Sequence, residues 1–163
     1  MSGRSTDGKA ATLDPGGAPD RSTRILVADD QDGVRRFVGR ALRKSGHHVE
    51  LAKDGLAALE ALAAEPFDLL IADIVMPGLD GVELALKAAK DYPDMPVLVI
   101  TGYAAQHQRA HGLDHLIHGV LSKPFSLRQI QRAADTALAT RPRTTYSDSA
   151  GPIRQNRRSN RSM

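Results

Sequence analysis

The chain has 163 residues, of which 41% are apolar and 25% are charged, as is typical of one soluble globular domain. The absence of cysteine excludes a disulfide framework and a cysteine nucleophile, and three tyrosines and three phenylalanines are too few for a base-stacking nucleic-acid platform. The net charge of +3 is divided unevenly, because residues 24–140 carry 13 basic and 15 acidic side chains whereas residues 141–163 carry six arginines and one aspartate.

The two ends of the chain lack hydrophobic periodicity. Residues 1–23 are small, polar and rich in glycine and proline, and residues 141–163 are similar but rich in arginine. Neither segment can bury enough apolar area to offset the entropy of ordering, so we expect a disordered N-terminal extension at 1–23 and a basic, disordered C-terminal tail at 141–163. We interpret the tail as solvated rather than as a nucleic-acid or membrane contact. No apolar run approaches the ~20 residues that span a bilayer, and a secretory signal is absent, so we expect a cytoplasmic protein.

Between these ends, residues 24–140 alternate short apolar runs with helical patterns. The runs expected to form strands are Ile25–Ala28, Val49–Ala52, Leu69–Ala72, Val97–Ile100 and Val120–Leu121 with its flanks. Apolar residues recurring at intervals of three and four predict amphipathic helices between and after them. The expected buried faces are Val34, Phe37, Val38, Ala41 and Leu42; Leu56, Leu59, Leu62 and Ala63; Val82, Ala85, Leu86 and Ala89; and Leu127, Ile130, Ala134, Ala137 and Leu138. A Ser126/Gln129 capping box is expected to open the last helix.

This alternation predicts an α/β fold. Near-continuous apolar strands separated by amphipathic helices are typical of a parallel sheet covered on both faces. Five such units in about 120 residues fit a flavodoxin-like, doubly wound five-stranded parallel sheet of order 2-1-3-4-5 better than a barrel, which needs about 250 residues. Residues 103–118 contain few large apolar side chains and a central Gly112, so the fourth helix is expected to be short or mobile.

Polar side chains end four strands that this order places side by side. The first strand is expected to end in Asp29-Asp30, the third in Asp73, the fourth in Thr101 and the fifth in Lys123. Ligands of open α/β sheets bind at the carboxyl ends of the strands, so these side chains are expected to share one pocket. Three neighbouring carboxylates repel one another unless a cation joins them, and Mg²⁺ prefers oxygen ligands. An aspartate there can act as a nucleophile that takes a phosphoryl group.

The motifs resemble the receiver domain of two-component response regulators, the CheY-like family. They are Asp29-Asp30, Asp73-Ile74-Val75-Met76-Pro77 followed by Asp80-Gly81, Thr101, and Lys123-Pro124-Phe125, in register across residues 24–140. The resemblance implies that Asp73 is the phosphoacceptor and that Mg²⁺ is bound by Asp29, Asp30, Asp73 and the backbone carbonyl of Val75. It also implies that Lys123 contacts the phosphoryl group beside a Lys-Pro bond that is usually cis, and that Thr101 turns its hydroxyl toward the phosphate after transfer.

More narrowly, the segments LLIADIVMPGLDGVELA, VITGYAA and VLSKPFSLR are similar to CpdR-type single-domain response regulators. Those proteins act as phosphorylation-controlled adaptors for the ClpXP protease. The resemblance implies a stand-alone phosphorelay protein rather than an enzyme. Its expected partners are a sensor histidine kinase or phosphotransferase and a protein target or adaptor client, with no specific nucleic acid and no membrane span. The expected assembly is a monomer or weak homodimer.

Two positions depart from the family pattern. The aromatic residue that usually stands three before the lysine is Val120 here, and Thr101 is followed by Gly102 and Tyr103. The usual coupling between threonine and an aromatic ring is therefore in doubt. Instead, the resemblance implies a phosphorylation-dependent change of mobility in residues 102–118.

Other interpretations of the same residues belong to different classes. A haloacid-dehalogenase-type phosphohydrolase also uses an aspartyl phosphate, and Asp30-Gln31-Asp32 resembles its first motif, but that class would leave Asp73 without a role. A protein-docking module that no longer accepts phosphate is another alternative, but such a module would not need all five of the pocket residues, Asp29, Asp30, Asp73, Thr101 and Lys123. His107, His111 and His115, with His118 nearby, suggest a metal site at helical spacing, yet a solvated polar segment is the simpler interpretation.

Overall fold

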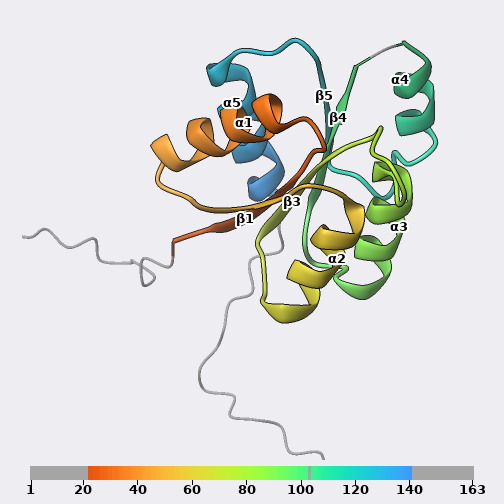
Figure 1. The fold of residues 1–163 in the computed structure, drawn as a ribbon, viewed down its shortest axis with the longest axis horizontal. Coiled ribbons are helices and arrows are strands. Elements are labelled where there is room, and N and C mark those ends of the chain that lie inside the picture. The colour runs from red at the N-terminus through yellow and green to blue at the C-terminus, as the bar shows by residue number, and fades with distance from the viewer. Residues whose placement is uncertain (1–21, 103, 141–163) are drawn as a thin grey trace, which may run out of the picture.

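The computed structural model describes residues 22–102 and 104–140, with the side chains of 104–107 left aside (Figure 1). The extensions expected at 1–23 and 141–163 lie almost entirely outside this range and stay predictions. Five strands alternate with five helices, in the order β1 Arg24–Ala28, α1 Asp32–Lys44, β2 His48–Ala52, α2 Gly55–Ala64, β3 Leu69–Asp73, α3 Gly81–Asp91, β4 Val97–Thr101, α4 Ala104–His111, β5 Gly119–Ser122 and α5 Leu127–Ala139. None of the described helices is both long and apolar enough to cross a membrane.

The strands form one parallel sheet in the order β2-β1-β3-β4-β5, which confirms the predicted topology. Helices α1 and α5 cover one face of the sheet, and α2, α3 and α4 cover the other (Figure 1). Every residue of β3 and β4 is buried, as the apolar runs predicted. The edge strands β2 and β5 alternate between half-buried and exposed residues, apart from the buried Ala52, because only one neighbour flanks each of them.

Two apolar cores separate the sheet from its helices. Alternate residues of each central strand point to opposite faces, so Leu26 packs toward α2 and α3 while Ile25 and Val27 pack toward α1 and α5. The α5 side is closed by Ile130, and the expected Ser126/Gln129 capping box starts α5. This packing holds the carboxyl ends of the central strands in fixed positions.

Three of the predicted helix faces are partly wrong. In α1, Phe37 was expected to be buried but is 38% exposed, and its ring lies beside that of Phe125, with the centroids 6.1 Å apart. Leu56 in α2 and Leu86 in α3 point outward, with 61% and 45% of their surface exposed, and Ala58 and Leu84 are buried in their place. Helix α2 is apolar almost all around (GLAALEALAA), so hydrophobic spacing alone cannot determine which face it buries. Small alanine side chains allow the helix to lie close to the sheet, whereas a leucine at that position would hold it away.

Helix α4 has eight residues and is short, as expected. Its mobility stays a prediction. It ends at His111, so His115 lies beyond it and the histidines do not share one continuous helical face. His118 has a structural contact, since its Nδ1 accepts from the Val97 backbone N–H at 3.1 Å and its own N–H donates to the Val97 carbonyl at 2.7 Å. These two bonds join the residue before β5 to the start of β4.

Candidate functional site

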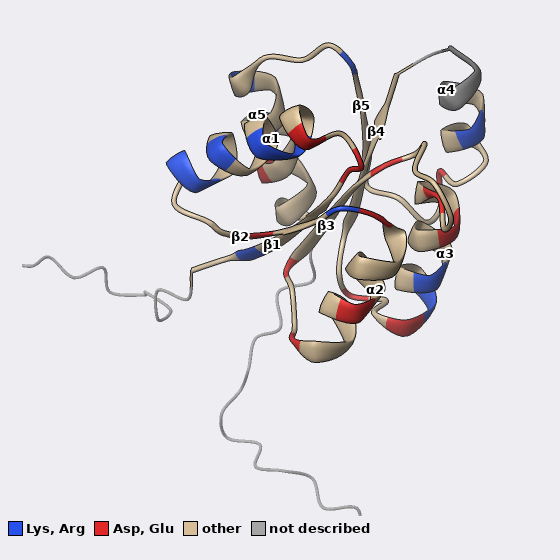
Figure 2. Ribbon diagram, in the orientation of Figure 1, with Lys and Arg blue, Asp and Glu red and all other residues tan. Residues whose placement is uncertain are grey.

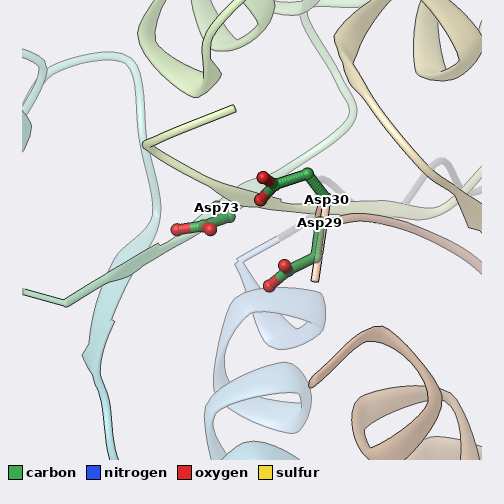
Figure 3. A group of neighbouring side chains, drawn as sticks. All are labelled: Asp29, Asp30 and Asp73. Carbon is green, nitrogen blue, oxygen red and sulfur yellow. The ribbon is translucent and has the colours of Figure 1, made fainter. Parts of the chain in front are cut away.

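The candidate site lies at the carboxyl ends of β1, β3, β4 and β5. Figure 3 shows the carboxylates of Asp29, Asp30 and Asp73 directed into one space, and one oxygen of each lies within 4.8 Å of the others. Asp29 is fully buried and Asp73 nearly so, whereas Asp30 is exposed. The structure therefore brings together the three carboxylates that the sequence predicted at this edge.

Lys123 completes the acidic cluster from β5. Its Nζ lies 3.3 Å from Asp73 Oδ2 and 3.7 Å from Asp29 Oδ2. The Lys123–Pro124 peptide bond is cis, and the Lys123 backbone N–H donates to the carbonyl of Thr101 at 2.8 Å. Thr101 ends β4 and is fully buried. The structure thus places Lys123 beside the carboxylates and joins its backbone to Thr101 at the end of β4.

The loop between β3 and α3 is held against the end of β3 by Gly81. The Gly81 backbone N–H donates to the Ile74 carbonyl at 2.8 Å. A Cβ atom at this position would lie 2.1 Å from the Asp73 carbonyl oxygen, closer than any real Cβ contact. Only glycine permits this approach, so Gly81 fixes the backbone that carries the phosphoacceptor candidate.

Asp80 connects this loop to two helices. Its Oδ1 accepts from the backbone N–H groups of Val82 and Glu83 at 2.9 and 3.0 Å, which caps α3. Its Oδ2 accepts from Arg109 of α4 at 2.6 Å. Although partial burial raises the pKa of Asp80, the Glu83 N–H and Arg109 outweigh it and lower that pKa below its usual value. No local pattern in the sequence predicts this ion pair, because Asp80 and Arg109 are 29 residues apart.

Two further residues at the site were missed by the sequence reasoning. The guanidinium of Arg35 donates to the Asp29 carbonyl at 2.8 Å and to Asp32 Oδ1 at 2.7 Å, which ties the β1–α1 loop to the first turn of α1. Gln31 donates its backbone N–H to Asp29 Oδ1 at 2.8 Å, and its side-chain oxygen lies 3.4 Å from Lys123 Nζ. The three-residue spacing of Asp32 and Arg35 on a helix was the only available signal.

Burial dominates the electrostatics of the carboxylates. It raises the pKa of Asp29 to about 6, against the lowering by the Gln31 N–H; the charges of Asp73 and Asp30 raise it further, and Lys123 lowers it. Burial also raises the pKa of Asp73, and the ammonium of Lys123 and the backbone N–H of Val75 offset part of this effect. The cluster therefore carries more negative charge than its surroundings stabilise.

The donor set fits a hard divalent cation. Asp29 Oδ2 is buried and accepts no hydrogen bond from the described residues, and Lys123 Nζ at 3.7 Å is too distant to donate one, so the oxygen is left for a closer cation. Three carboxylates converging on one space are ligands that Mg²⁺ prefers. Asp29, Asp30 and Asp73 are the side chains that would hold the ion. The part assigned to the Val75 carbonyl stays a prediction.

The raised pKa of Asp29 predicts a pH-dependent stability. The folded chain retains a proton on Asp29 up to about pH 6, whereas the ordinary value for the unfolded chain is 3.8. In the presence of a chelator, the free energy of unfolding is expected to fall as the pH rises through this window, by up to about 3 kcal/mol. Urea unfolding at several pH values measures this slope.

The Asp29→Asn variant isolates the effect of this one group from other titrations. Its stability is expected to be flatter across the same window, and the Asp91→Asn variant at the end of α3 is the matched control, since Asp91 is exposed. Saturating Mg²⁺ is expected to flatten the wild-type slope as well, because the cation stabilises the ionised cluster. Equal slopes for wild type and Asp29→Asn in chelator would contradict the assignment.

Comparison with protein families gives one match to this region. The model described as "Response regulator receiver domain" matches residues 25–135. The "Response regulator receiver protein CpdR" of Brucella abortus (strain 2308) is 46% identical over 107 residues, which cover 66% of this chain and 89% of that protein. "Response regulator MprA" of Mycobacterium tuberculosis (strain H37Rv) is 40% identical over 109 residues, 67% of this chain and 47% of that protein. The chain thus spans about half the length of MprA.

Solved structures show the same fold. The receiver domain of NtrX from Brucella abortus aligns with a TM-score of 0.67 and 30% identity, covering 71% of this chain and 98% of that one. The Vibrio cholerae chemotaxis protein CheY4 aligns with a TM-score of 0.66 and 27% identity, again covering 71% and 98%. Each alignment therefore covers about seven tenths of this chain.

Proposed function

Because the chain belongs to the response regulator receiver domain family, we propose that it accepts a phosphoryl group on Asp73 from a histidine kinase or phosphotransferase. The phosphorylated form then signals by contact with a partner protein. The observation that carries this proposal is the convergence of Asp29, Asp30, Asp73 and Lys123 at one edge of the sheet. Phosphoryl transfer needs this combination of a carboxylate nucleophile and opposing positive charge.

The residues have distinct roles in the transfer. An oxygen of Asp73 attacks the phosphorus of a phosphohistidine, the new O–P bond forms as the P–N bond breaks, and the imidazole nitrogen keeps the electron pair. Lys123, already 3.3 Å from Asp73 Oδ2, offsets the negative charge of the phosphoryl oxygens. A bound Mg²⁺ would supply further positive charge for those oxygens. Thr101, at the end of the neighbouring strand β4, is proposed to donate its hydroxyl to the phosphate.

A small-molecule phosphodonor tests this function without knowledge of the kinase. The full-length chain is incubated with acetyl phosphate and Mg²⁺, and intact mass spectrometry is expected to detect the mass of one added phosphoryl group. The same incubation with excess chelator is expected to give no addition. Undiminished labelling in chelator, or no labelling with Mg²⁺, would contradict the proposal.

The phosphohydrolase alternative is not favoured by the geometry. That class would use Asp30 as nucleophile and Asp32 as its acid-base partner. In the structure the Asp32 carboxylate pairs with Arg35 at 2.7 Å and with Arg36 at 3.1 Å, on the first turn of α1. Both carboxylate oxygens of Asp32 are thus engaged by guanidinium groups, whereas an acid-base partner needs a carboxyl group that can approach the substrate.

The output of the phosphorylated form is proposed to be a protein–protein contact, including the delivery of client proteins to a protease. The support is the similarity to a protein named CpdR, of which the alignment covers 89%. Affinity capture from a bacterial extract, with and without the phosphoryl mimic beryllofluoride, tests this output. Capture of a protease or its client only in the mimic-bound form is the expected result. Identical captures in both forms would contradict it.

Val75 predicts slow loss of the phosphoryl group. Its apolar side chain stands two residues after Asp73 and is 48% exposed, so it shields the acyl phosphate without orienting a water molecule. The Val75→Asn variant is expected to lose its phosphoryl group about threefold to tenfold faster, because an amide can position the attacking water. The decay of phosphoprotein after removal of the donor measures this rate, with Val75→Ile as the control. An unchanged or slower decay in Val75→Asn would be contrary to this prediction. Tyr103, which was expected to act with Val75, lies outside the described residues.

A further inference from the structure

The open edge of the sheet at β2 carries a row of cationic side chains that the phosphoacceptor site does not use. The row lies on α1 at intervals of three and four residues, where Lys and Arg are drawn blue along that helix (Figure 2). Its members line a groove of about 560 Å³ with Leu51 of β2. We call this the α1–β2 groove, and its residues are Arg36, Arg40, Arg43, Lys44 and Leu51.

The groove continues along the strand in both directions. A hollow of about 400 Å³ adjoins it at Arg43 and reaches His48 and Phe67. Another, of about 490 Å³, adjoins it at Arg36 and Leu51 and reaches the side of α2. Because the groove shares lining residues with each hollow, the three lie in series beside β2, with lining residues from His48 to Ala52.

The strand itself presents backbone groups to this series of hollows. In the parallel pairing with β1, His48 donates its N–H to the Thr23 carbonyl and the Ala52 carbonyl accepts from Asp29. In a parallel pair, only every second residue of a strand bonds to its partner strand. Val49 and Leu51 are the residues between, so their backbone groups point away from β1 toward the open edge of the sheet. Arg43 donates to the Val49 carbonyl at 2.9 Å. The backbone groups of Leu51 are left for a further strand.

The positive charge of the row is poorly neutralised. Within the part of the chain that the structure describes, the carboxylate of Asp32 pairs with Arg35 and Arg36, and no ion pair involves Arg40 or Lys44. Both of the latter residues are exposed. Two adjacent cations without a counterion attract an acidic partner. Such complementary charge raises the rate of association and favours acidic partners over basic ones.

The spacing of the cations matches an extended peptide. Residues four apart on a helix are separated by about 6 Å along its axis, as are Arg36, Arg40 and Lys44. Alternate residues of an extended chain face the same side and are separated by about 6.6 to 6.8 Å. A peptide with acidic side chains at alternate positions can therefore place one carboxylate at each cation while its backbone runs beside β2.

We propose that the α1–β2 groove binds an extended acidic peptide segment of a partner protein, which adds to the edge of the sheet at β2. The backbone pairs with Leu51, and alternate carboxylates contact Arg40 and Lys44. A nucleic-acid strand fits less well, because the carboxylates of Asp32 and Glu50 interrupt the cationic lining of the adjoining hollows, although Arg24 pairs with Glu50 at 3.6 Å. The same carboxylates oppose a uniformly anionic lipid surface. This binding is independent of phosphorylation at Asp73.

The test uses the full chain and a fluorescent eleven-residue peptide of alternating Glu and Val as the probe. Fluorescence anisotropy at low salt measures its affinity for wild type, for Arg40→Glu/Lys44→Glu, and for the control Arg128→Glu/Arg132→Glu. The control makes the same change of net charge at exposed positions of α5. The α1 variant is expected to bind at least about tenfold more weakly, and the control within about twofold of wild type. A Gln–Val peptide is expected to bind at least about tenfold more weakly as well.

Amide chemical shifts locate the bound peptide. The largest changes are expected at Val49 and Leu51. Equal losses in the α1 variant and the control, or shifts confined to other surfaces, would overturn the proposal. So would tighter binding of a single-stranded oligonucleotide of matched charge, or of phosphatidylglycerol vesicles, than of the acidic peptide. Circular dichroism verifies folding of each variant, and Arg40→Gln/Lys44→Gln, which removes charge without reversing it, is expected to show an intermediate loss.

Discussion

Replacing Asp73 with asparagine is expected to abolish phosphoryl incorporation, with a loss of about 100-fold or more in labelling by acetyl phosphate and Mg²⁺. The amide oxygen is a poor nucleophile. Lys123 Nζ lies closer to Asp73, at 3.3 Å, than to the fully buried Asp29, at 3.7 Å, so Asp29 is not expected to replace Asp73 as acceptor. Intact mass spectrometry followed by peptide mapping measures the change. Asp91→Asn, at the exposed end of α3, is the matched control and is expected to label like wild type.

The stability of the Asp73→Asn variant separates a chemical effect from misfolding. Burial and the neighbouring carboxylates raise the pKa of Asp73, so removal of its charge relieves repulsion in the absence of a metal. In chelator, its melting temperature is therefore expected to equal or exceed that of wild type. Labelling of Asp73→Asn at the wild-type level would mean that another residue is the phosphoacceptor.

Adding one methyl group at Gly81 is expected to destabilise the fold by several kcal/mol. The new Cβ of Gly81→Ala would lie 2.1 Å from the Asp73 carbonyl oxygen and 2.7 Å from the Cα of Ile74. Both neighbours are backbone atoms at the end of a buried central strand, so the first turn of α3 must move. Urea unfolding of the full chain measures the change in free energy.

Gly33→Ala is the matched control for Gly81→Ala. Gly33 also lies in the first turn of a helix, α1, but nothing is within 4 Å of the position that its Cβ would take. Alanine there is expected to leave the stability unchanged or raise it by up to about 1 kcal/mol, because the unfolded chain loses more freedom. Equal effects of the two substitutions would show that the contact at Gly81 does not control the loop. A destabilised Gly81→Ala that still labels normally would show that the loop relaxes around Asp73.

Much of the fold was predictable because its signals are local. Runs such as Leu69–Ala72 and Val97–Ile100 are apolar without interruption, which is typical of central parallel strands. Five strand-helix units predicted the strand order. Because ligands of open α/β sheets bind at the carboxyl ends of the strands, this order also predicted that Asp73 and Lys123 lie close together. The third and fourth strands end at Asp73 and Thr101 as predicted, whereas the first ends at Ala28 and the fifth at Ser122, before the polar residues expected to end them.

The faces that α2 and α3 bury against the sheet were not predictable from hydrophobic spacing. In α2 nearly every residue is apolar, so Leu56 and Ala58 are equivalent candidates for burial by composition. Only the close approach of the helix to the sheet decides between them, in favour of the smaller side chain. In α3, the contact of Gly81 with the end of β3 sets the rotation that buries Leu84.

By itself, the sequence determined the order of strands and helices, the parallel sheet, and the set of carboxylates, hydroxyl and ammonium at its edge, because hydrophobic period and strand ends are encoded in neighbouring residues. Only the tertiary structure decided the contacts between distant residues. Arg109 meets Asp80 across 29 positions, and Lys123 meets Gln31 across 92. The groove beside Leu51 likewise exists only because α1 packs on β2. Such contacts depend on how whole elements pack against one another, and no local pattern specifies that arrangement.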